Sequence, residues 1–277
     1  MEIFIRTTPY TGPIRAVVLD WAGTAVDYGC IGPVAVFIEV FKRRGVQVTT
    51  AEARGPMGLM KKDHVRSMCQ SESVASKWQQ VHGRPPDEND VEAMYAEVEP
   101  LLVSSVARYA DPIPGLSEAL AAFRKNDIRI GSTTGYTAPM MDVLTPQARR
   151  RGYTPDSIVC PSHVPAGRPY PWMCYQNAIN LQVYPMEAMV KIGDTISDIH
   201  EGLNAGMWTI AVSKTGNELG LTEAEVTALQ PGDLKKRLDA IEKRFRKAGA
   251  HHVVESVEQC PPFIAAINVR LARGERP

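Results

Sequence analysis

The 277-residue sequence lacks the features that mark membrane, secreted and nucleic-acid-binding proteins. It has no run of about 18 apolar residues, so we expect no membrane span. Its N-terminus has no long apolar segment followed by a small-residue cleavage site, which argues against a signal peptide. Lys plus Arg and Asp plus Glu each number 31, giving a formal net charge of zero. The overall charge therefore favours neither nucleic acid nor an anionic membrane as partner.

Cysteine is also scarce, and the five residues are scattered without a C-x-x-C motif: Cys30, Cys69, Cys160, Cys174 and Cys260. Neither a disulfide framework nor a thiolate zinc site is expected from this pattern. A cytoplasmic location is the default for such cysteine usage. The hydrophobic fraction of 44% excludes a disordered chain and is typical of a globular protein.

Five short apolar runs predict buried strands, at residues 16–19, 128–133, 157–160, 189–192 and 208–212. Most are followed by Gly, Asp, Ser or Thr and then by helical periodicity, which favours an α/β fold with a Rossmann-like parallel sheet. A shorter strand is expected at residues 252–254. Ligands of such sheets bind at the carboxyl ends of the strands. The residues of interest are therefore Asp20, Thr134, Asp194 and Asp198.

Roughly a hundred residues between the first two runs show helical patterns only. Because a crossover between parallel strands needs just one helix, we expect an inserted helical cap domain at residues 29–107. Residues 1–28 plus 108–277 would then form the core domain. Thr49 and Glu52 have the spacing of a capping box.

One apolar stripe of the expected cap has helical spacing: Val34, Phe37, Ile38 and Phe41. This stripe could pack inside the cap or form an exposed interface between two copies of the chain. The sequence leaves both alternatives open.

The carboxylates at the strand ends suit phosphoryl chemistry. Asp20 precedes a Gly-containing loop and could attack phosphorus as a nucleophile, or it could cap a turn. Asp194 and Asp198 are four residues apart and, with a phosphate, would form a Mg²⁺ site. The alternative is an acidic pair at a helix N-terminus.

Basic and hydroxyl residues could complete this site. Thr134 follows the second run and could donate to a phosphate oxygen, while Arg168 offers a guanidinium fork. In the cap, a lysine in a poorly solvated pocket could form a Schiff base, and Lys61 and Lys62 are both candidates. His64 lies one helical turn from Lys61 and could move protons. A solvated basic helix face is the alternative for this segment.

Four elements in this order resemble the haloacid dehalogenase superfamily over residues 14–212: D-x-x-G-T, a hydroxyl after the second strand, a basic residue, and G-D-x-x-x-D. Members that hydrolyse phosphate esters carry D-x-D, whereas Ala22 occupies the place of the second Asp here. The usual acid–base step is therefore missing.

A closer resemblance, from residue 14 to the 251–254 region, is to the phosphonatase family of that superfamily. It rests on D-W-A-G-T, P-M-G-L-x-K-x-D-H-V-R, G-S-T-T-G-Y, V-P-A-G-R-P-Y-P-W-M-C-Y and G-D-T-x-S-D. The resemblance implies hydrolysis of the P–C bond of phosphonoacetaldehyde, within the degradation of 2-aminoethylphosphonate. It also implies a small-molecule phosphonate as ligand and a homodimer.

The same resemblance implies a role for each matching residue. Asp20 would be the nucleophile, Lys61 the Schiff-base residue and His64 the proton shuttle. Mg²⁺ would be held by Asp20, the Ala22 backbone carbonyl and Asp194, with Asp198 in support. Substrate would be bound by Thr134, Arg168, Tyr136, Met57, Gly58 and Cys30. For the Cys30 thiol, a small buried hydrophobe is the commoner role.

Two other functions are kept open. A phosphate-ester phosphatase or phosphosugar mutase is opposed by Ala22 and Lys61. A non-catalytic binding or scaffold protein is opposed by the joint presence of Asp20, Asp194 and Lys61.

Overall fold

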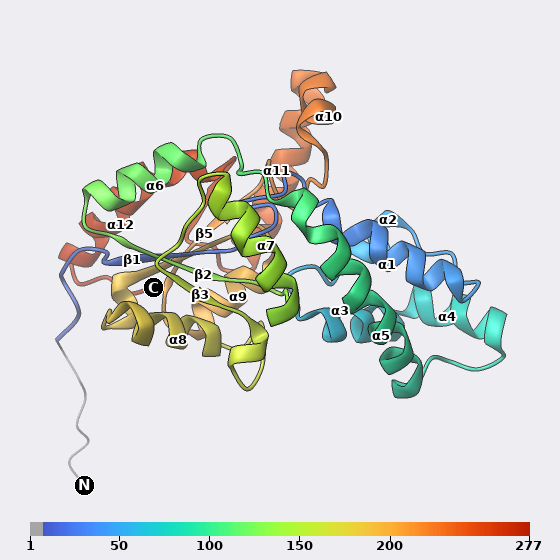
Figure 1. Ribbon diagram of the computed structural model, residues 1–277. Coiled ribbons are helices and arrows are strands. Elements are labelled where there is room, and N and C mark those ends of the chain that lie inside the picture. The colour runs from blue at the N-terminus through green and yellow to red at the C-terminus, as the bar shows by residue number, and fades with distance from the viewer. Residues whose placement is uncertain (1–7) are drawn as a thin grey trace, which may run out of the picture.

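The computed structural model describes residues 8–277 and confirms the predicted α/β class (Figure 1). Its described residues form one parallel sheet in the order β3-β2-β1-β4-β5-β6. The strands are β1 (Ala16–Leu19), β2 (Arg129–Thr133), β3 (Ser157–Val159), β4 (Met189–Gly193), β5 (Trp208–Val212) and β6 (His252–Val254). Each predicted strand is present, and no end differs by more than one residue. The first strand therefore lies in the middle of the sheet, between β2 and β4.

Helices cover both faces of this sheet because its side chains alternate between them. Val17 and Leu19 belong to the large apolar core on one face, which is covered by α6 (Leu116–Lys125), α7 (Ala138–Arg150) and α12 (Cys260–Ala272). Ala16 and Val18 pack on the other face. That face is covered by α8 (Trp172–Leu181), α9 (Ile196–Asn204) and α11 (Pro231–Lys247). The short α10 (Glu223–Ala228) precedes α11 and projects from the core (Figure 1).

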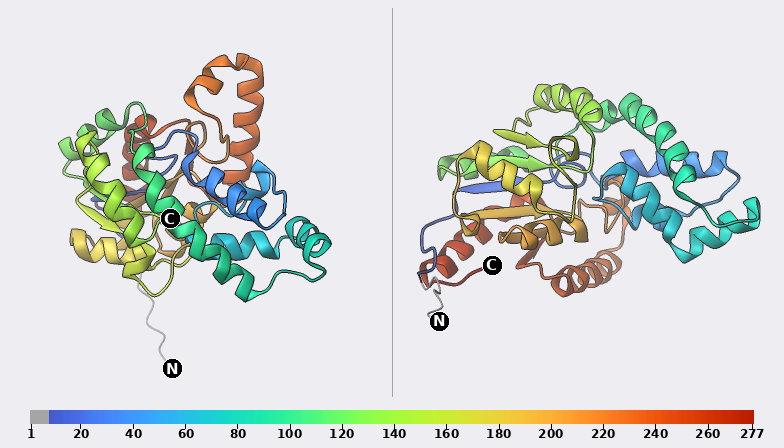
Figure 2. Two further views of the ribbon diagram at one scale, coloured as in Figure 1. Left: turned by 45° about the vertical axis from the view of Figure 1, so that its right-hand side comes forward. Right: turned by 90° about the horizontal axis from the view of Figure 1, so that it is seen from below.

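Of the six α-helices between β1 and β2, the first five gather at one end of the molecule, beyond the sheet (Figures 1 and 2). They are α1 (Gly32–Arg43), α2 (Thr50–Arg54), α3 (Lys61–Gln70), α4 (Glu72–His82) and α5 (Glu88–Ser105), followed by a 3-10 helix at Val106–Tyr109. We call these five the cap helices and propose residues 29–107 as the cap domain. The capping box of Thr49 and Glu52 at the start of α2 is confirmed.

The apolar stripe of α1 resolves the alternative that the sequence left open. Phe37 and Phe41 are fully buried and Val34 is only 6% exposed. Phe41 packs edge-on against Trp78 of α4, and Phe37 lies against His64 of α3. The expectation that these side chains could form an exposed interface is therefore wrong, because they make up the core of the cap.

Two further expectations from the sequence concern membrane spans and disulfide bonds. Within the described residues, every helix is too short or too polar to cross a membrane. All five cysteines are buried and free. The expectation of no signal peptide, and the start of the core domain at residue 1, involve residues 1–7, which lie outside the described residues.

Candidate active site

The predicted carboxylates meet at the carboxyl end of the sheet. Asp20 follows β1, Asp194 follows β4, and Asp198 lies in the first turn of α9. One oxygen of each lies within 4.8 Å of the others, and all three residues are buried. Neighbouring parallel strands bring their carboxyl ends to one edge of the sheet, so residues 174 positions apart in the sequence become neighbours.

The loop after β1 holds the Asp194 carboxylate closely. Gly23 has φ +89°, and a Cβ there would lie 2.1 Å from Asp194 Oδ2, so only glycine fits. Thr24 Oγ1 donates to Asp194 Oδ1 at 3.3 Å, and the Asn217 backbone N–H donates to Oδ2 at 2.7 Å. Thr24 and Asn217 were not predicted as site residues. Thr24 belongs to the D-x-x-G-T segment, but nothing local indicates that the distant Asn217 reaches Asp194.

Asp198 is held by protein partners on both oxygens. Its Oδ2 accepts the Thr195 hydroxyl at 2.5 Å and the Thr195 backbone N–H at 3.2 Å, in a capping box at the start of α9. Its Oδ1 lies 2.8 Å from Lys191 Nζ and 3.0 Å from Arg168 Nη1. Burial acts to raise the pKa of Asp198, but the two cations outweigh it and hold that pKa below its usual value. This arrangement suits a supporting carboxylate.

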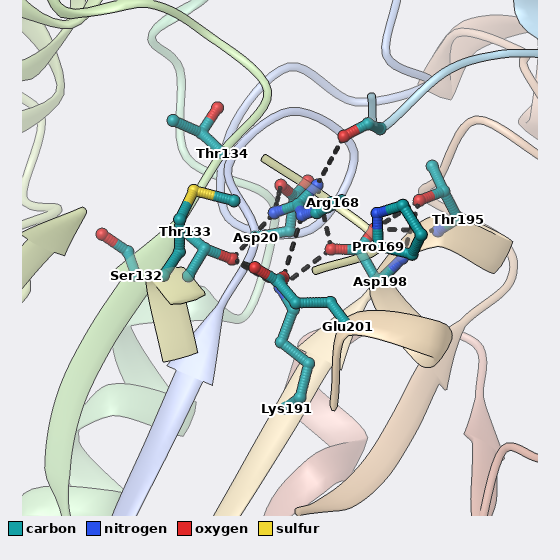
Figure 3. Close-up of polar contacts among 12 residues, drawn as sticks. Asp20, Ser132, Thr133, Thr134, Arg168, Pro169, Lys191, Thr195, Asp198 and Glu201 are labelled. Atoms are coloured by element: carbon teal, nitrogen blue, oxygen red, sulfur yellow. Dashed lines mark hydrogen bonds and ion pairs between the residues drawn. The ribbon is translucent and has the colours of Figure 1, made fainter. Parts of the chain in front are cut away.

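Arg168 is the centre of a buried charge network (Figure 3). Its Nη2 lies 2.7 Å from Asp20 Oδ1, and its Nε lies 2.9 Å from Glu201 Oε2. Glu201 also lies 3.4 Å from Lys191 Nζ. Neither Glu201 nor Lys191 was predicted to belong to the site. The sequence does hold a hint of each: Glu201 is three residues after Asp198 on one helix face, and Lys191 interrupts an apolar strand.

The cap contributes Lys61, the first residue of α3. This residue is only 3% exposed, and its Nζ lies 4.8 Å from the Tyr136 ring centroid. Within residues 8–277, no group makes a hydrogen bond or an ion pair with this Nζ. Burial lowers the pKa of Lys61 to about 8. Lys62, in contrast, forms an ion pair with Glu92 on the surface of the cap.

His64 lies one turn further along α3 and is fully buried. Its ring stacks on Phe37, with centroids 3.8 Å apart and planes at 8°. Nε2 lies 2.9 Å from the Ala53 carbonyl oxygen, which can only accept, so the proton resides on Nε2. Nδ1 is then an unprotonated acceptor, and it is buried without a partner. Burial, reinforced by the charge of Lys61, lowers the pKa of His64 well below its usual value.

Most of the predicted site residues line a single cavity between cap and core. The exceptions are His64 and Asp198, which are fully buried and do not line it. The predicted residues that line it are Asp20, Ala22, Cys30, Met57, Gly58, Lys61, Thr134, Tyr136, Arg168 and Asp194. The cavity volume that the centre of a water molecule can occupy is about 20 Å³. That is room for about one water. A ligand larger than a water molecule can therefore enter only if the cap or the lining moves.

Two glycines let the cap close this tightly. Gly58 has φ +90°, and a Cβ there would lie 2.4 Å from Thr195 Oγ1 of the core. At Gly135 of the core, a Cβ would lie 2.4 Å from the Leu59 carbonyl oxygen of the cap. Arg168 Nη1 also donates to the Gly58 carbonyl at 3.4 Å. The structure is therefore that of a closed cap.

The donor set fits a divalent cation. Asp20, Asp194 and Asp198 offer hard oxygen ligands, which Mg²⁺ prefers. Glu201 adds a fourth buried carboxylate, and only two cations, Arg168 and Lys191, form ion pairs with this group. Burial, and then repulsion from Asp20, raises the pKa of Asp194 well above its usual value. A divalent cation would supply the charge that keeps both carboxylates ionised.

Comparison with known proteins identifies the family. The model of the haloacid dehalogenase-like hydrolases matches residues 14–206. Two proteins of Syntrophobacter fumaroxidans, a phosphonoacetaldehyde hydrolase-like protein and a phosphonoacetaldehyde hydrolase, are 62% and 60% identical to this chain over the full length of both chains. The chain is a member of the phosphonoacetaldehyde hydrolase family. It is thus an enzyme, and it belongs to the haloacid dehalogenase-like hydrolases.

Further members of the family agree with this assignment. The phosphonoacetaldehyde hydrolase of Bacillus cytotoxicus is 53% identical over 92% of this chain and 96% of that protein. The crystal structure of a phosphonoacetaldehyde hydrolase-like protein from Oleispira antarctica superposes with a TM-score of 0.95 at 38% identity, covering all of both chains.

Proposed function

We propose that this protein hydrolyses phosphonoacetaldehyde to acetaldehyde and phosphate, through an imine on Lys61 and an aspartyl-phosphate on Asp20. The observation that carries the proposal is that an unpaired, buried lysine and a nucleophilic carboxylate line one closed cavity. The names of relatives at 53–60% identity support the same substrate.

The amine of Lys61 is suited to attack the aldehyde. Its low pKa leaves part of it neutral near pH 7, and loss of water from the adduct gives a protonated imine. His64 has an unprotonated Nδ1 one helical turn away, and we propose that it takes up and returns the protons of these steps. Its low pKa means that it holds each proton only transiently. Tyr136 and Cys30 stay protonated, because burial raises the pKa of each well above its usual value.

The P–C bond then breaks without forming a free carbanion. Asp20 forms a P–O bond, and the electron pair of the P–C bond becomes the π bond of an enamine on Lys61. Water hydrolyses the aspartyl-phosphate to phosphate and free Asp20. Protonation of the enamine carbon followed by hydrolysis releases acetaldehyde and restores Lys61, so that one water is consumed overall.

This leaving group explains Ala22. An ester oxygen leaves as an alkoxide unless an acid protonates it, and a second Asp would supply that proton. An enamine needs no proton at that position, because its electron pair is stabilised from the cap. A small residue at position 22 therefore agrees with P–C cleavage and disagrees with ester hydrolysis.

The phosphonate group would be bound by Arg168 and by Thr134, which follows the carboxyl end of β2. The guanidinium of Arg168 already lies 2.7 Å from Asp20 Oδ1, which places its charge where the phosphonate must meet the nucleophile. Mg²⁺ would be held by Asp20, the Ala22 carbonyl and Asp194, supported by Asp198, and when bound it offsets repulsion between Asp20 and the phosphonate dianion.

The test combines imine trapping with phosphate release. Phosphonoacetaldehyde and cyanoborohydride are expected to place an adduct on Lys61, located by peptide mass spectrometry, and phosphate release is expected to need Mg²⁺. Lys61→Ala should abolish both signals, whereas Lys62→Ala, which changes the neighbouring surface lysine, should leave both intact. A folded protein that forms no adduct and releases no phosphate would contradict the proposal.

A cytoplasmic location and a homodimer are further parts of this proposal. The buried stripe of α1 is not available as the dimer contact. Sedimentation velocity of the purified protein is expected to show a dimer, and a monomer at micromolar concentration would contradict that expectation.

A further inference from the structure

Arg54, at the end of the cap helix α2, reaches out of the cap into the core. Its Nη1 donates to the Gly29 carbonyl at 2.9 Å and the Cys30 carbonyl at 3.3 Å, both in the linker between β1 and α1. The same Nη1 donates to Asn217 Oδ1 at 3.0 Å, and Nη2 donates to the Gly220 carbonyl at 3.0 Å. A single guanidinium therefore joins cap, linker and the loop that follows β5.

Asn217 continues this connection to the candidate metal site. Its side-chain amide accepts from Arg54 Nη1 and donates back to the Arg54 carbonyl at 3.3 Å. Its backbone N–H donates to Asp194 Oδ2 at 2.7 Å. Asn217 is 5% exposed, so these bonds are shielded from water. Arg54 and Asp194 are thus linked through one residue while the cap is closed.

The packing around the pair leaves little freedom. Gly220 has φ +66°, and a Cβ there would lie 2.7 Å from Arg54 Nε. A Cβ at Gly216 would lie 2.3 Å from the Asp194 Cβ. The loop that carries Asn217 therefore fits against Asp194 on one side and against Arg54 on the other.

We propose that Arg54 and Asn217 are positioning residues that couple closure of the cap to the orientation of the Asp194 carboxylate. Opening the cap separates Arg54 from Asn217 and Gly220, and the loop then loses one of the contacts that hold the Asn217 N–H against Asp194. The bond from Thr215 Oγ1 to the Gly23 carbonyl remains. The complete ligand set would form only with the cap closed. The effect on turnover rests on the proposed function, whereas the coupling itself does not.

The first measurement needs neither metal nor substrate. Hydrogen–deuterium exchange of residues 213–221 is expected to become faster in Arg54→Gln and in Asn217→Ala. The matched control is Arg66→Gln, which removes a cap arginine whose ion-pair partners, Asp63 and Glu88, both lie in the cap. Exchange of residues 213–221 should be unchanged in that variant. Unchanged exchange in Arg54→Gln, with circular dichroism showing a folded protein, would overturn the proposal.

The second measurement is a double-mutant cycle. Each single variant is expected to raise the Mg²⁺ concentration for half-maximal phosphate release by about tenfold, the lower end of the effect of removing groups that orient metal ligands. The variant with both changes should lose about the same factor as either alone, because the pair acts as one connection. Losses that multiply to about a hundredfold would overturn the coupling. Arg54→Lys, which keeps the charge without the fork, should resemble Arg54→Gln.

The two measurements separate the two proposals. If the wild-type protein releases no phosphate from phosphonoacetaldehyde, the proposed function fails, and exchange together with calorimetric Mg²⁺ binding still decides the coupling. If Arg54→Gln does not fold, Asn217→Ala is the variant that tests the coupling. It keeps the backbone N–H that donates to Asp194 and loses the side-chain hydrogen bonds to Arg54.

Discussion

The rate at which Lys61 forms an imine should depend on pH with a midpoint near 8, the pKa that burial gives this lysine. At pH 7 a group with that pKa is neutral in about one molecule in eleven, against about one in 2,500 for an ordinary lysine with a pKa of about 10.4. The structure thus predicts a roughly 200-fold larger neutral fraction at neutral pH. Since the pKa of this cation is lowered, the neutral fraction rises about tenfold per pH unit up to pH 7 and levels off above pH 8.

The assay is the initial rate of cyanoborohydride trapping by phosphonoacetaldehyde in metal-free buffer between pH 6 and 10, read at the Lys61 peptide. Trapping without metal isolates imine formation from P–C cleavage. Lys62→Ala supplies the matched control, since it removes a surface lysine of the same helix and should leave the profile unchanged. A rate that climbs steadily to pH 10 would refute the reasoning, because it would show a solvated lysine.

Three further outcomes are expected. His64→Gln, which keeps a donor for the Ala53 carbonyl but not the free Nδ1, should slow trapping by roughly 10²–10⁴-fold with little change in the urea midpoint; an unchanged rate would remove His64 from proton transfer. Phe37→Ala and Phe41→Ala should each lower the free energy of unfolding by about 3–5 kcal/mol in urea titrations. Only Phe37→Ala should also move the trapping profile to higher pH, and a shift in both would mean a general loosening of the cap. Chelation of Mg²⁺, or Asp194→Asn, should abolish phosphate release while the Lys61 adduct still forms, and loss of both signals would contradict separate roles for cap and core.

The parts of the fold that local patterns determine were predictable. Apolar runs that end in Asp20 and Asp194 placed both carboxylates at strand ends, because buried parallel strands are continuous apolar segments. The capping box at Thr49 is a contact between residues three positions apart, so it is visible in the sequence. The division of the chain into core and cap remains a proposal that these patterns support.

Other features depend on packing between distant segments. The stripe of Phe37 and Phe41 has the periodicity of any amphipathic helix, and only the folded cap shows what covers it. Glu201 reaches Arg168 across 33 residues and Arg54 reaches Asn217 across 163. No local spacing indicates such pairs, whereas the residues lining the cavity were available through resemblance to a family.

Burial beneath the closed cap gives Lys61 its low pKa, so opening would return the amine to water and to its protonated form. An aldehyde that meets the open protein would encounter an ammonium group, which does not form an imine. Lys61 would become neutral only after the cap has closed, so it would react only with a molecule already held beneath the cap. The space there is small. The fold would thereby protect Lys61 from reaction with other carbonyl compounds. Selectivity would then depend on the state of the cap in which the neutral amine forms, as well as on which molecule fits the cavity.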